Sequence, residues 1–221
     1  MLGLRQRIEL EVVDRDWLNE MATRYHYMHR PVHLRGCPFG WAVLFDSKRF
    51  QSDGAPSGFI MFASIHFVRL HGEFGYEGLP SKWQVLSLSR LWLHDNLPRN
   101  SETCTIAKAL KRVQRRWLEV HPPRFPDQPY HVRKVISYAD TRYHRGTIYR
   151  AANFRDTGRT HSRKRHRNTK GPGLDGAELI RFIYDLPEPK WKWRTGMGLP
   201  LFDQVGAANG RSIDGGEGNV V

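Results

Sequence analysis

The chain has 221 residues, which suits one domain with a full core and is too short for two large domains. Lysine and arginine outnumber aspartate and glutamate by 35 to 22, so the surface carries a positive field that attracts polyanions such as DNA or RNA. Two distant cysteines, Cys37 and Cys104, exclude a disulfide framework and a cysteine-ligated zinc site. No apolar run is long enough to span a bilayer and the charged N-terminus does not resemble a signal peptide, so we expect a cytoplasmic protein without membrane contact.

The first part of the chain predicts a strand, a helix and a hairpin. Residues 8–13 alternate between apolar and polar side chains as a short strand does. The next segment, DRDWLNEMATRYHYMHR, begins with an aspartate cap and has apolar residues at helical spacing. We therefore expect a helix that carries His26, Tyr27 and His29 at its end. The runs GWAVLFD and SGFIMFASIHFV predict two strands joined by a polar turn, and hence a hairpin.

A central strand and a long helix are expected next. The run QVLSLSRLWLHD is apolar almost throughout, which is typical of a strand buried on both faces. Between residues 101 and 121, apolar side chains recur every three or four positions and predict a helix with one apolar face: Ile106, Leu110, Val113, Trp117 and Val120. The opposite face of this helix is basic.

The remaining segments complete one domain. VRKVISYAD predicts a strand, a short helix follows with Ile148, Ala151 and Ala152 as packing residues, and residues 154–170 and 178–187 predict two closing strands. We assign residues 1–204 to the domain and expect the glycine-rich tail, residues 205–221, to be disordered. This order predicts the α/β (α+β) class, with a central mixed sheet flanked by helices. A dinucleotide-binding fold is excluded because no GxGxxG follows the first strand.

Two opposite charges in apolar strands mark a candidate active site. Arg90 lies among leucines and a tryptophan, so if buried it needs an anionic partner, and Asp140 at the end of the neighbouring strand is such a partner. The turn after that strand adds Tyr143, His144 and Tyr149, which supply groups that accept and donate protons. Tyr149 is the preferred proton donor. The alternative is a buried salt bridge that only fixes the sheet.

Two further segments suggest cofactor sites. The helix that begins near residue 101 offers free backbone amides beside Arg99, Asn100, Ser101 and Thr103, a set that suits a phosphate or pyrophosphate. Ordinary helix capping also explains the hydroxyls, although it does not explain the arginine. His26 and His29 are candidate metal ligands, although their spacing matches no standard ligand pattern.

Basic and aromatic residues occur together in several segments, as contact with phosphates and stacking on bases requires. A solvated basic surface explains the charges but not the tryptophans. The candidate DNA-binding residues are Arg30, Arg35, Arg159, Arg163, Lys164, Arg165, Arg167, Trp191 and Trp193.

The blocks HYMHRPV, LSRLWLHDNLPRNSET, ISYADT and GTIYRAANFRDTG resemble the Mom family of phage DNA-modification proteins and their bacterial relatives. The resemblance covers roughly residues 25–158. It implies a GNAT acetyltransferase-like fold and, residue by residue, functional roles for Tyr27, Arg90, Asp140 and Tyr149. The usual GNAT pyrophosphate loop is replaced by LPRNSE, which departs from ordinary acetyl-CoA binding. The resemblance leaves a coenzyme A thioester and iron open as cofactors.

The family's activity implies a function for this chain. We expect an enzyme that adds a carbamoylmethyl-type (acetamido) group to the 6-amino group of adenine in double-stranded DNA and so protects phage DNA from host restriction. One alternative is a CoA-dependent N-acetyltransferase that acts on a small amine or a protein. A second alternative is a nucleic-acid-binding protein that has kept the fold and lost the chemistry.

Overall fold

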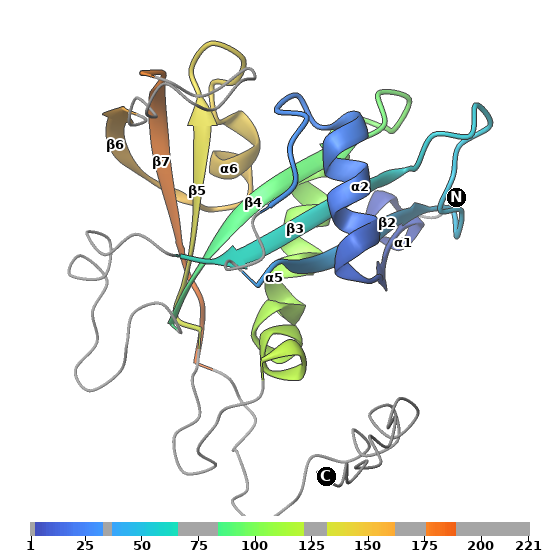
Figure 1. Cartoon of the computed structure of the whole chain (residues 1–221), viewed down its shortest axis with the longest axis horizontal. Helices are drawn as coiled ribbons and strands as arrows, with labels where there is room; N and C mark the ends of the chain where they lie inside the picture. The colour runs from blue at the N-terminus through green and yellow to red at the C-terminus, as the bar shows by residue number, and fades with distance from the viewer. Residues whose placement is uncertain (1–2, 33–36, 66–83, 122–131, 162–175, 189–221) are drawn as a thin grey trace, which may run out of the picture. The chain divides into compact units, whose positions relative to one another are not determined.

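Seven strands form one mixed sheet in the computed structural model, which describes residues 3–32, 37–65, 84–121, 132–161 and 176–188 (Figure 1). Their spatial order is β1-β2-β3-β4-β5-β7-β6. Only the β4–β5 pair is parallel, and every other neighbouring pair is antiparallel. The strands are β1 (Ile8–Val12), β2 (Phe39–Phe45), β3 (Gly58–Ser64), β4 (Val85–Leu93), β5 (Lys134–Asp140), β6 (Arg155–His161) and β7 (Glu178–Asp185).

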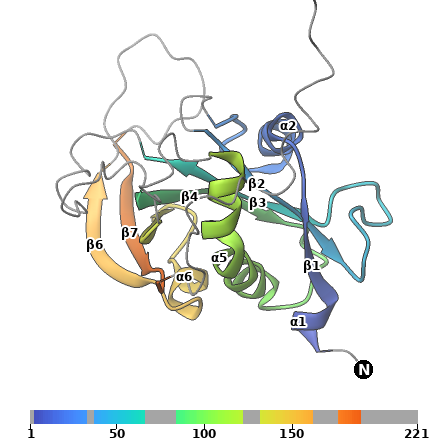
Figure 2. The same ribbon diagram turned by 90° about the horizontal axis from the view of Figure 1, so that it is seen from below.

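Helices cover the two faces of this sheet. On one face lies α2 (Arg15–Tyr25), and on the other lie α5 (Ser101–Val120) and the short α6 (Thr147–Ala151), as Figures 1 and 2 show. A single turn, α1 (Leu4–Arg7), precedes β1. The predicted class, a central mixed sheet flanked by helices, is confirmed. No helix within the described segments is long and apolar enough to cross a membrane.

Each long helix packs through the face that its sequence predicts. The side chain of Asp14 caps α2 by accepting a hydrogen bond from the backbone N–H of Trp17 at 2.7 Å. Leu18 and Met21 are buried against Phe59 and Met61 of β3. The apolar face of α5 is buried on the opposite side of the sheet: Ile106, Leu110, Val113 and Trp117.

Part of the basic face of α5 is structural. Lys108 donates a hydrogen bond to the backbone carbonyl of Ile8, and Arg112 donates one to the carbonyl of Leu10 at 3.1 Å. These bonds satisfy carbonyl groups of the edge strand β1, which otherwise face solvent. Lys108 and Arg112 are therefore tied to the sheet.

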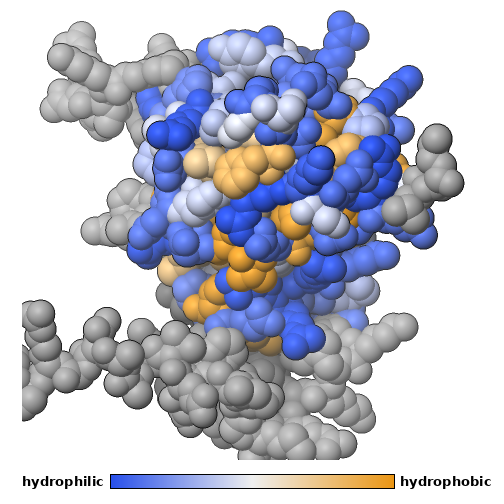
Figure 3. Space-filling model, turned by 90° about the vertical axis from the view of Figure 1, so that its right-hand side faces the viewer, coloured by the Kyte–Doolittle hydropathy of each residue, from blue (hydrophilic) through white to orange (hydrophobic). Residues whose placement is uncertain are grey.

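The edge of the molecule beside β1 is hydrophilic with an apolar band between the polar side chains (Figure 3). Two of its arginines form ion pairs, Arg7 with Asp46 at 2.7 Å and Arg49 with Glu11 at 2.6 Å. Pairing with carboxylates neutralises much of the positive charge, so these two arginines are poorly suited to hold phosphates.

The short helix α6 differs from the prediction in its packing. Ala152 is buried and Ile148 packs against the core, as expected, but Ala151 is exposed. Tyr149 takes its place and stacks on Phe182 of β7 with ring centroids 5.0 Å apart. The single turn α1 was not predicted. The expected disordered tail, residues 205–221, lies outside the described residues, so the boundary at residue 204 stays a prediction.

A β-bulge in β4 determines which way Arg90 points. Phe62 of β3 pairs with Leu88 and Met61 pairs with Arg90, so Ser89 is an additional residue in β4. Leu88 and Phe62 pack in the core beneath α5, whereas Met61 packs under α2. Side chains two apart in a regular strand share a face, so without the bulge Arg90 would point toward α5. The extra residue turns Arg90 to the α2 face.

The strands β4 and β5 separate before they reach their polar residues. Their register runs only from Val85–Lys134 to Ser87–Ile136, and the two strands then diverge (Figure 1). Asp140 lies four positions beyond Ile136 and therefore on the same face of β5. Ile136 packs with Val85 on the face of the sheet opposite to α5. Arg90 and Asp140 thus face the same side of the sheet, on two strands that have parted.

We expect Gly146→Ala to lower the free energy of unfolding by about 2–3 kcal/mol, since it combines backbone strain with a steric clash. Gly146 precedes α6 with φ 73°, and an added Cβ would lie 2.2 Å from the Phe182 ring on which Tyr149 stacks. Gly54→Ala is the matched control, because Gly54 has φ 80° with no atom within 4 Å of the added Cβ. Urea unfolding should show a loss of only about 1 kcal/mol for the control; equal losses would contradict the packing assigned to Gly146.

Candidate active site

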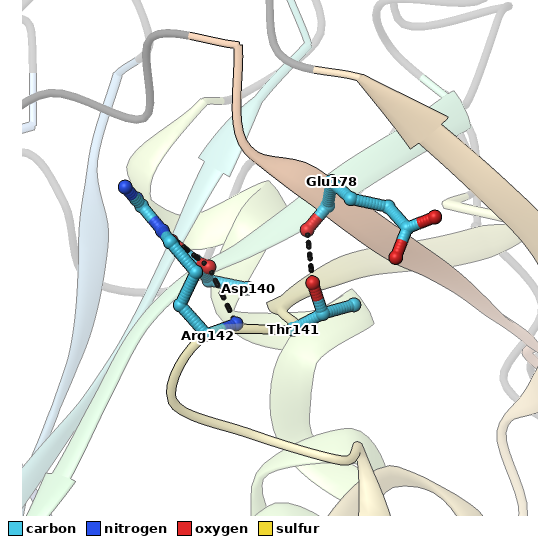
Figure 4. A network of polar contacts seen from close by, with 4 residues as sticks. All are labelled: Asp140, Thr141, Arg142 and Glu178. Carbon is cyan, nitrogen blue, oxygen red and sulfur yellow. Dashed lines mark hydrogen bonds and ion pairs between the residues drawn. The ribbon is translucent and has the colours of Figure 1, made fainter.

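The buried carboxylate of Asp140 is bound by a residue of the loop that follows it. Arg142 donates to both oxygens of Asp140, from Nη2 to Oδ2 at 2.6 Å and from Nε to Oδ1 at 3.0 Å, and its backbone N–H also donates to Oδ1 at 3.0 Å. The Asp140 side chain has no exposed surface, whereas that of Arg142 is 48% exposed. Figure 4 shows the guanidinium of Arg142 folded back over the carboxylate.

A second contact fixes the same loop to the sheet. Thr141 donates from Oγ1 to the backbone carbonyl of Glu178 at 3.0 Å, so its side chain points toward β7 and away from Asp140 (Figure 4). The hydrogen bonds from Arg142 are the largest influence on Asp140 and lower the pKa of its carboxyl, in opposition to burial, which raises it. Asp140 is consequently ionised at neutral pH.

The expected pairing of Arg90 with Asp140 is wrong, because Arg142 forms the ion pair with the carboxylate of Asp140. Arg90 instead donates from Nη1 to the backbone carbonyl of Ser89 at 2.6 Å. Its Nε is buried without a hydrogen-bond partner, and Arg90 forms no ion pair with any carboxylate of the described segments. Burial lowers the pKa of this guanidinium, although an arginine remains charged at neutral pH. Arg90 is thus a partly buried cation whose Nε is still able to donate a hydrogen bond.

Tyr27 is the residue at which the separate parts of the site meet. The pKa of its phenol is raised to about 12, mainly by burial and also by Asp140 and Tyr149, while Arg90 and Arg142 oppose this rise. Tyr27 therefore keeps its proton at neutral pH and lies within electrostatic reach of all four side chains. Tyr27 follows just after the end of α2, as the sequence predicts.

The imidazole of His26 lies beside Tyr27, with ring centroids 4.4 Å apart. Burial, aided by the positive charge of Arg90, lowers the pKa of His26 to about 3, so the ring is neutral at physiological pH. Its Nδ1 accepts a hydrogen bond from the backbone N–H of Met28 at 3.2 Å, which leaves the proton on Nε2. A neutral imidazole adds no further positive charge beside Arg90.

Tyr149 approaches from the α6 side of the sheet. Burial raises the pKa of its phenol, and a hydrogen bond with Ser137 of β5 opposes that rise. Ser137 also donates to the backbone carbonyl of Leu88 at 3.2 Å, across the point where β4 and β5 separate. Ser137 therefore connects Tyr149 to both strands.

His26 and His29 form no metal site with the other residues that the structure describes. Nδ1 of His26 is occupied by the bond from Met28, and Nδ1 of His29 is bonded to the carbonyl of Thr23 at 3.1 Å. Within the described residues no three His, Cys, Asp or Glu side chains lie close enough together to hold an ion. The donor set thus fails to fit iron, and the candidate metal role of His26 and His29 is not supported.

Only some of the predicted cofactor-binding residues lie where they can contact a cofactor. The helix α5 begins at Ser101 as expected, but the hydroxyl of Ser101 is buried and donates to the carbonyl of Pro98 at 2.6 Å. Arg99 and Asn100 are exposed, and Thr103 lines a groove of about 270 Å³ between α5 and α6. The groove also contains Arg5, Lys111 and Asn153, which could hold an anionic cofactor.

Two of the predicted DNA-binding residues lie in the described part of the chain. Arg30 is near enough to Arg90 to lower the pKa of that guanidinium, which places it beside the site. Arg159 is exposed on β6 and forms an ion pair with Glu178 at 2.6 Å. The others lie outside the described residues: Arg35, Arg163, Lys164, Arg165, Arg167, Trp191 and Trp193.

We expect Arg142→Gln to lower the free energy of unfolding at pH 7 by about 1–2 kcal/mol, since it leaves a buried carboxylate with only a backbone donor. Arg142 lowers the pKa of Asp140, so the ion pair stabilises the fold above the unfolded pKa of about 3.9 and ceases to do so as the pH falls through the folded value. The deficit of the variant, measured by urea unfolding, should therefore shrink below about pH 4.

Arg150→Gln is the matched control for this measurement. Arg150 is also 48% exposed and pairs with Asp156 at 2.7 Å, but that carboxylate is 39% exposed. A surface pair of this kind contributes about 1 kcal/mol or less. A deficit for Arg142→Gln that stays constant from pH 7 to pH 3 would show that the guanidinium does not stabilise the ionised form of Asp140.

Comparison with known proteins places the chain in a family. The sequence profile described as "Mom protein family" matches residues 7–172, which is most of the chain. The chain belongs to the Mom protein family. It is also 40% identical over 70 residues to "Methylcarbamoylase mom" of Escherichia phage Mu. That alignment spans 31% of this chain and 24% of the phage Mu protein, so the chain matches only about a quarter of its relative's length.

Solved structures show the same fold. NAA60 of Arabidopsis thaliana in complex with acetyl-CoA superimposes with a TM-score of 0.55 at 13% identity, over 81% of this chain and 98% of that one. The same enzyme in complex with a bisubstrate analogue gives a TM-score of 0.51 at 15% identity, over 80% and 97% of the two chains. The expected GNAT acetyltransferase-like fold is confirmed.

The sequence analysis did not identify Arg142, which binds the carboxylate of Asp140 and lowers its pKa. The signal lay in the spacing Asp-Thr-Arg directly after a strand, where a turn brings side chains two apart back together. Tyr143 was expected among the groups that accept and donate protons. The structure places its ring in solvent, 62% exposed, and 5.3 Å from the ring of Tyr27.

Proposed function

We propose that this protein is a DNA-modifying transferase that adds a carbamoylmethyl-type group to the 6-amino group of adenine. The single observation that carries the proposal is the meeting, around Tyr27, of Arg90, Asp140 and Tyr149 from separate parts of a chain that belongs to the Mom protein family. The phage Mu relative is named a methylcarbamoylase, which supports transfer of a group of this kind. The double-stranded DNA of phage and the cytoplasm of the host cell are the proposed substrate and location.

Each residue has a role that its environment suits. The target adenine leaves the base stack, because its amino group is otherwise paired, and enters beside Tyr27. Asp140 accepts a proton from the amino nitrogen as that nitrogen bonds to the methylene carbon of the group, while the bond from this carbon to the donor breaks. Tyr149, whose raised pKa keeps it protonated, protonates the departing donor. Arg90 stabilises the negative charge that develops.

The ion pair between Arg142 and Asp140 imposes an order on these events. Both oxygens of Asp140 are occupied by Arg142, so the amino group reaches the carboxylate only after Arg142 has moved. Arg142 is half-exposed, so a DNA phosphate can compete for its guanidinium. A simple acetyl transfer would leave an acetyl amide and not a carbamoylmethyl amine, so the donor is a molecule that carries the complete group.

Protection from restriction tests this function. DNA from bacteria that express the chain should resist restriction enzymes whose sites contain adenine and remain sensitive to enzymes whose sites lack it. DNA from cells with the empty vector is the control. Equal cleavage of the two DNAs, with the folded protein abundant in the cells, would count against the proposed function.

A CoA-dependent N-acetyltransferase is the second candidate, favoured by the acetyl-CoA named in the NAA60 structure and by the groove beside Thr103. The groove residues Arg5 and Lys111 would hold phosphates, and the bound thioester would supply an activated acyl group. This candidate predicts that acetyl-CoA binds and is consumed with a small amine in the absence of DNA. Parallel titrations with acetyl-CoA and with duplex DNA separate the two functions.

A further inference from the structure

An aromatic side chain is exposed beside the candidate site. Four large apolar side chains are exposed among the described residues, and Tyr143, at 62%, is the most exposed of them. The backbone that carries it is held in place, because the N–H groups of Tyr143 and His144 both donate to the carbonyl of Asp140, at 3.0 and 2.8 Å. An exposed aromatic ring on an ordered turn offers a face on which a base can stack.

The ring of Tyr143 belongs to a cluster that leads inward to the reaction centre. Tyr27 lies 5.3 Å from Tyr143 and 5.5 Å from His144, and His26 lies 4.4 Å from Tyr27 on its other side. Tyr27 and Tyr143 are already in contact, so no base fits between them, since a sandwiched base needs about 7 Å between the flanking rings. The exposed part of the Tyr143 ring is therefore the surface available for stacking.

The charges around this ring indicate the chemistry of the ligand. The guanidinium of Arg142 lies 5.4 Å from the centre of the Tyr143 ring, and Arg145 is exposed in the same loop. An exposed aromatic face beside cations is the combination that single-stranded nucleic acid requires, because its bases stack and its phosphates need positive charge. An acidic peptide would use the cations alone and leave the ring exposed.

We propose that Tyr143 is a base-stacking residue, which holds an unpaired base of the DNA strand beside Tyr27 and Arg142. The inference rests on the proposed function and makes it more specific, since it assigns strand recognition to the loop after Asp140. Stacking on Tyr143 keeps the strand locally unpaired and brings a phosphate within reach of Arg142.

The test uses two single-stranded oligonucleotides of equal length, one of deoxyadenosines with a central 2-aminopurine and one in which every base is absent. Wild-type protein should bind the first more tightly and quench the 2-aminopurine fluorescence. Tyr143→Leu should weaken binding of this oligonucleotide about ten-fold and abolish the quenching, whereas Tyr143→Phe should behave as wild type. Binding of the abasic oligonucleotide should be the same for all three proteins.

Phe50→Leu is the matched control, because Phe50 is 48% exposed on the β2–β3 connection and should leave both measurements unchanged. Thermal unfolding checks that Tyr143→Leu is folded. Equal affinity and equal quenching for Tyr143→Leu and wild type would overturn the inference alone, as would binding to duplex but not to single strands. Failure of the wild type to bind any DNA would overturn the proposed function together with the inference.

Discussion

Asp140→Asn is expected to reduce adenine modification by about a hundred- to ten-thousand-fold, because it removes the proposed proton acceptor. Asparagine has the same shape and still accepts a hydrogen bond from Arg142 through its amide oxygen. The change thus removes the negative charge without opening a cavity. The amount of modified adenosine formed per unit of folded protein measures the effect.

Asp185→Asn controls for the loss of one carboxylate from the sheet. Asp185 ends β7 and pairs with Lys134 and Arg155, with half of its side chain exposed. We expect modification by this variant to match the wild type. Full protection of DNA by Asp140→Asn would favour the alternative in which the chain only binds nucleic acid and has lost the chemistry.

Arg90→Met is expected to affect activity and stability in opposite directions. Activity should fall by about a hundred- to thousand-fold, because the buried cation is the group that stabilises developing negative charge. The free energy of unfolding should rise by about 1 kcal/mol. The Nε of Arg90 loses its contact with water in the folded state and gains no hydrogen-bond partner, and methionine removes this unfavourable contribution. Methionine has a similar length and fits beside Met61 and Trp92.

Urea unfolding and the modification assay on the same preparation measure both effects. Arg24→Met is the control, because Arg24 is 63% exposed and pairs only with Glu20 of the same helix, so neither quantity should change appreciably. A marked loss of stability in Arg90→Met would show that the arginine contributes to packing, and would remove the reason to regard it as a functional charge.

Most of the fold follows from hydrophobic periodicity, and the largest exception is local. The two long helices and every strand except β6 were predicted from an apolar pattern that repeats over several turns or residues, whereas β6 has no apolar side chain. The β4 bulge was not predicted, although its trace is in the sequence. Leucines occur at 86 and 88, then at 91 and 93, so the alternation shifts by one residue at Ser89. Reading this shift would have placed Arg90 on the opposite face from Leu88.

The site was harder to predict because its residues come from different segments. Periodicity indicates which strand carries Arg90 and which carries Asp140, but it does not show that the strands diverge after Ser87 and Ile136. Pairing the two opposite charges was therefore reasonable from sequence and wrong in structure, since Arg142 is closer along the chain and reaches the carboxylate first. Tyr27 was indicated by family resemblance, because nothing in its local pattern connects α2 with β5.

Nucleoside analysis of cellular DNA tests the central claim most directly. Bacteria expressing the wild-type chain are grown, their DNA is digested to nucleosides, and the adenosine fraction is analysed by mass spectrometry. The account predicts a deoxyadenosine heavier by one carbamoylmethyl group, present with the wild type and absent with Asp140→Asn. An adenosine fraction of unaltered mass from cells rich in folded wild-type protein would contradict it.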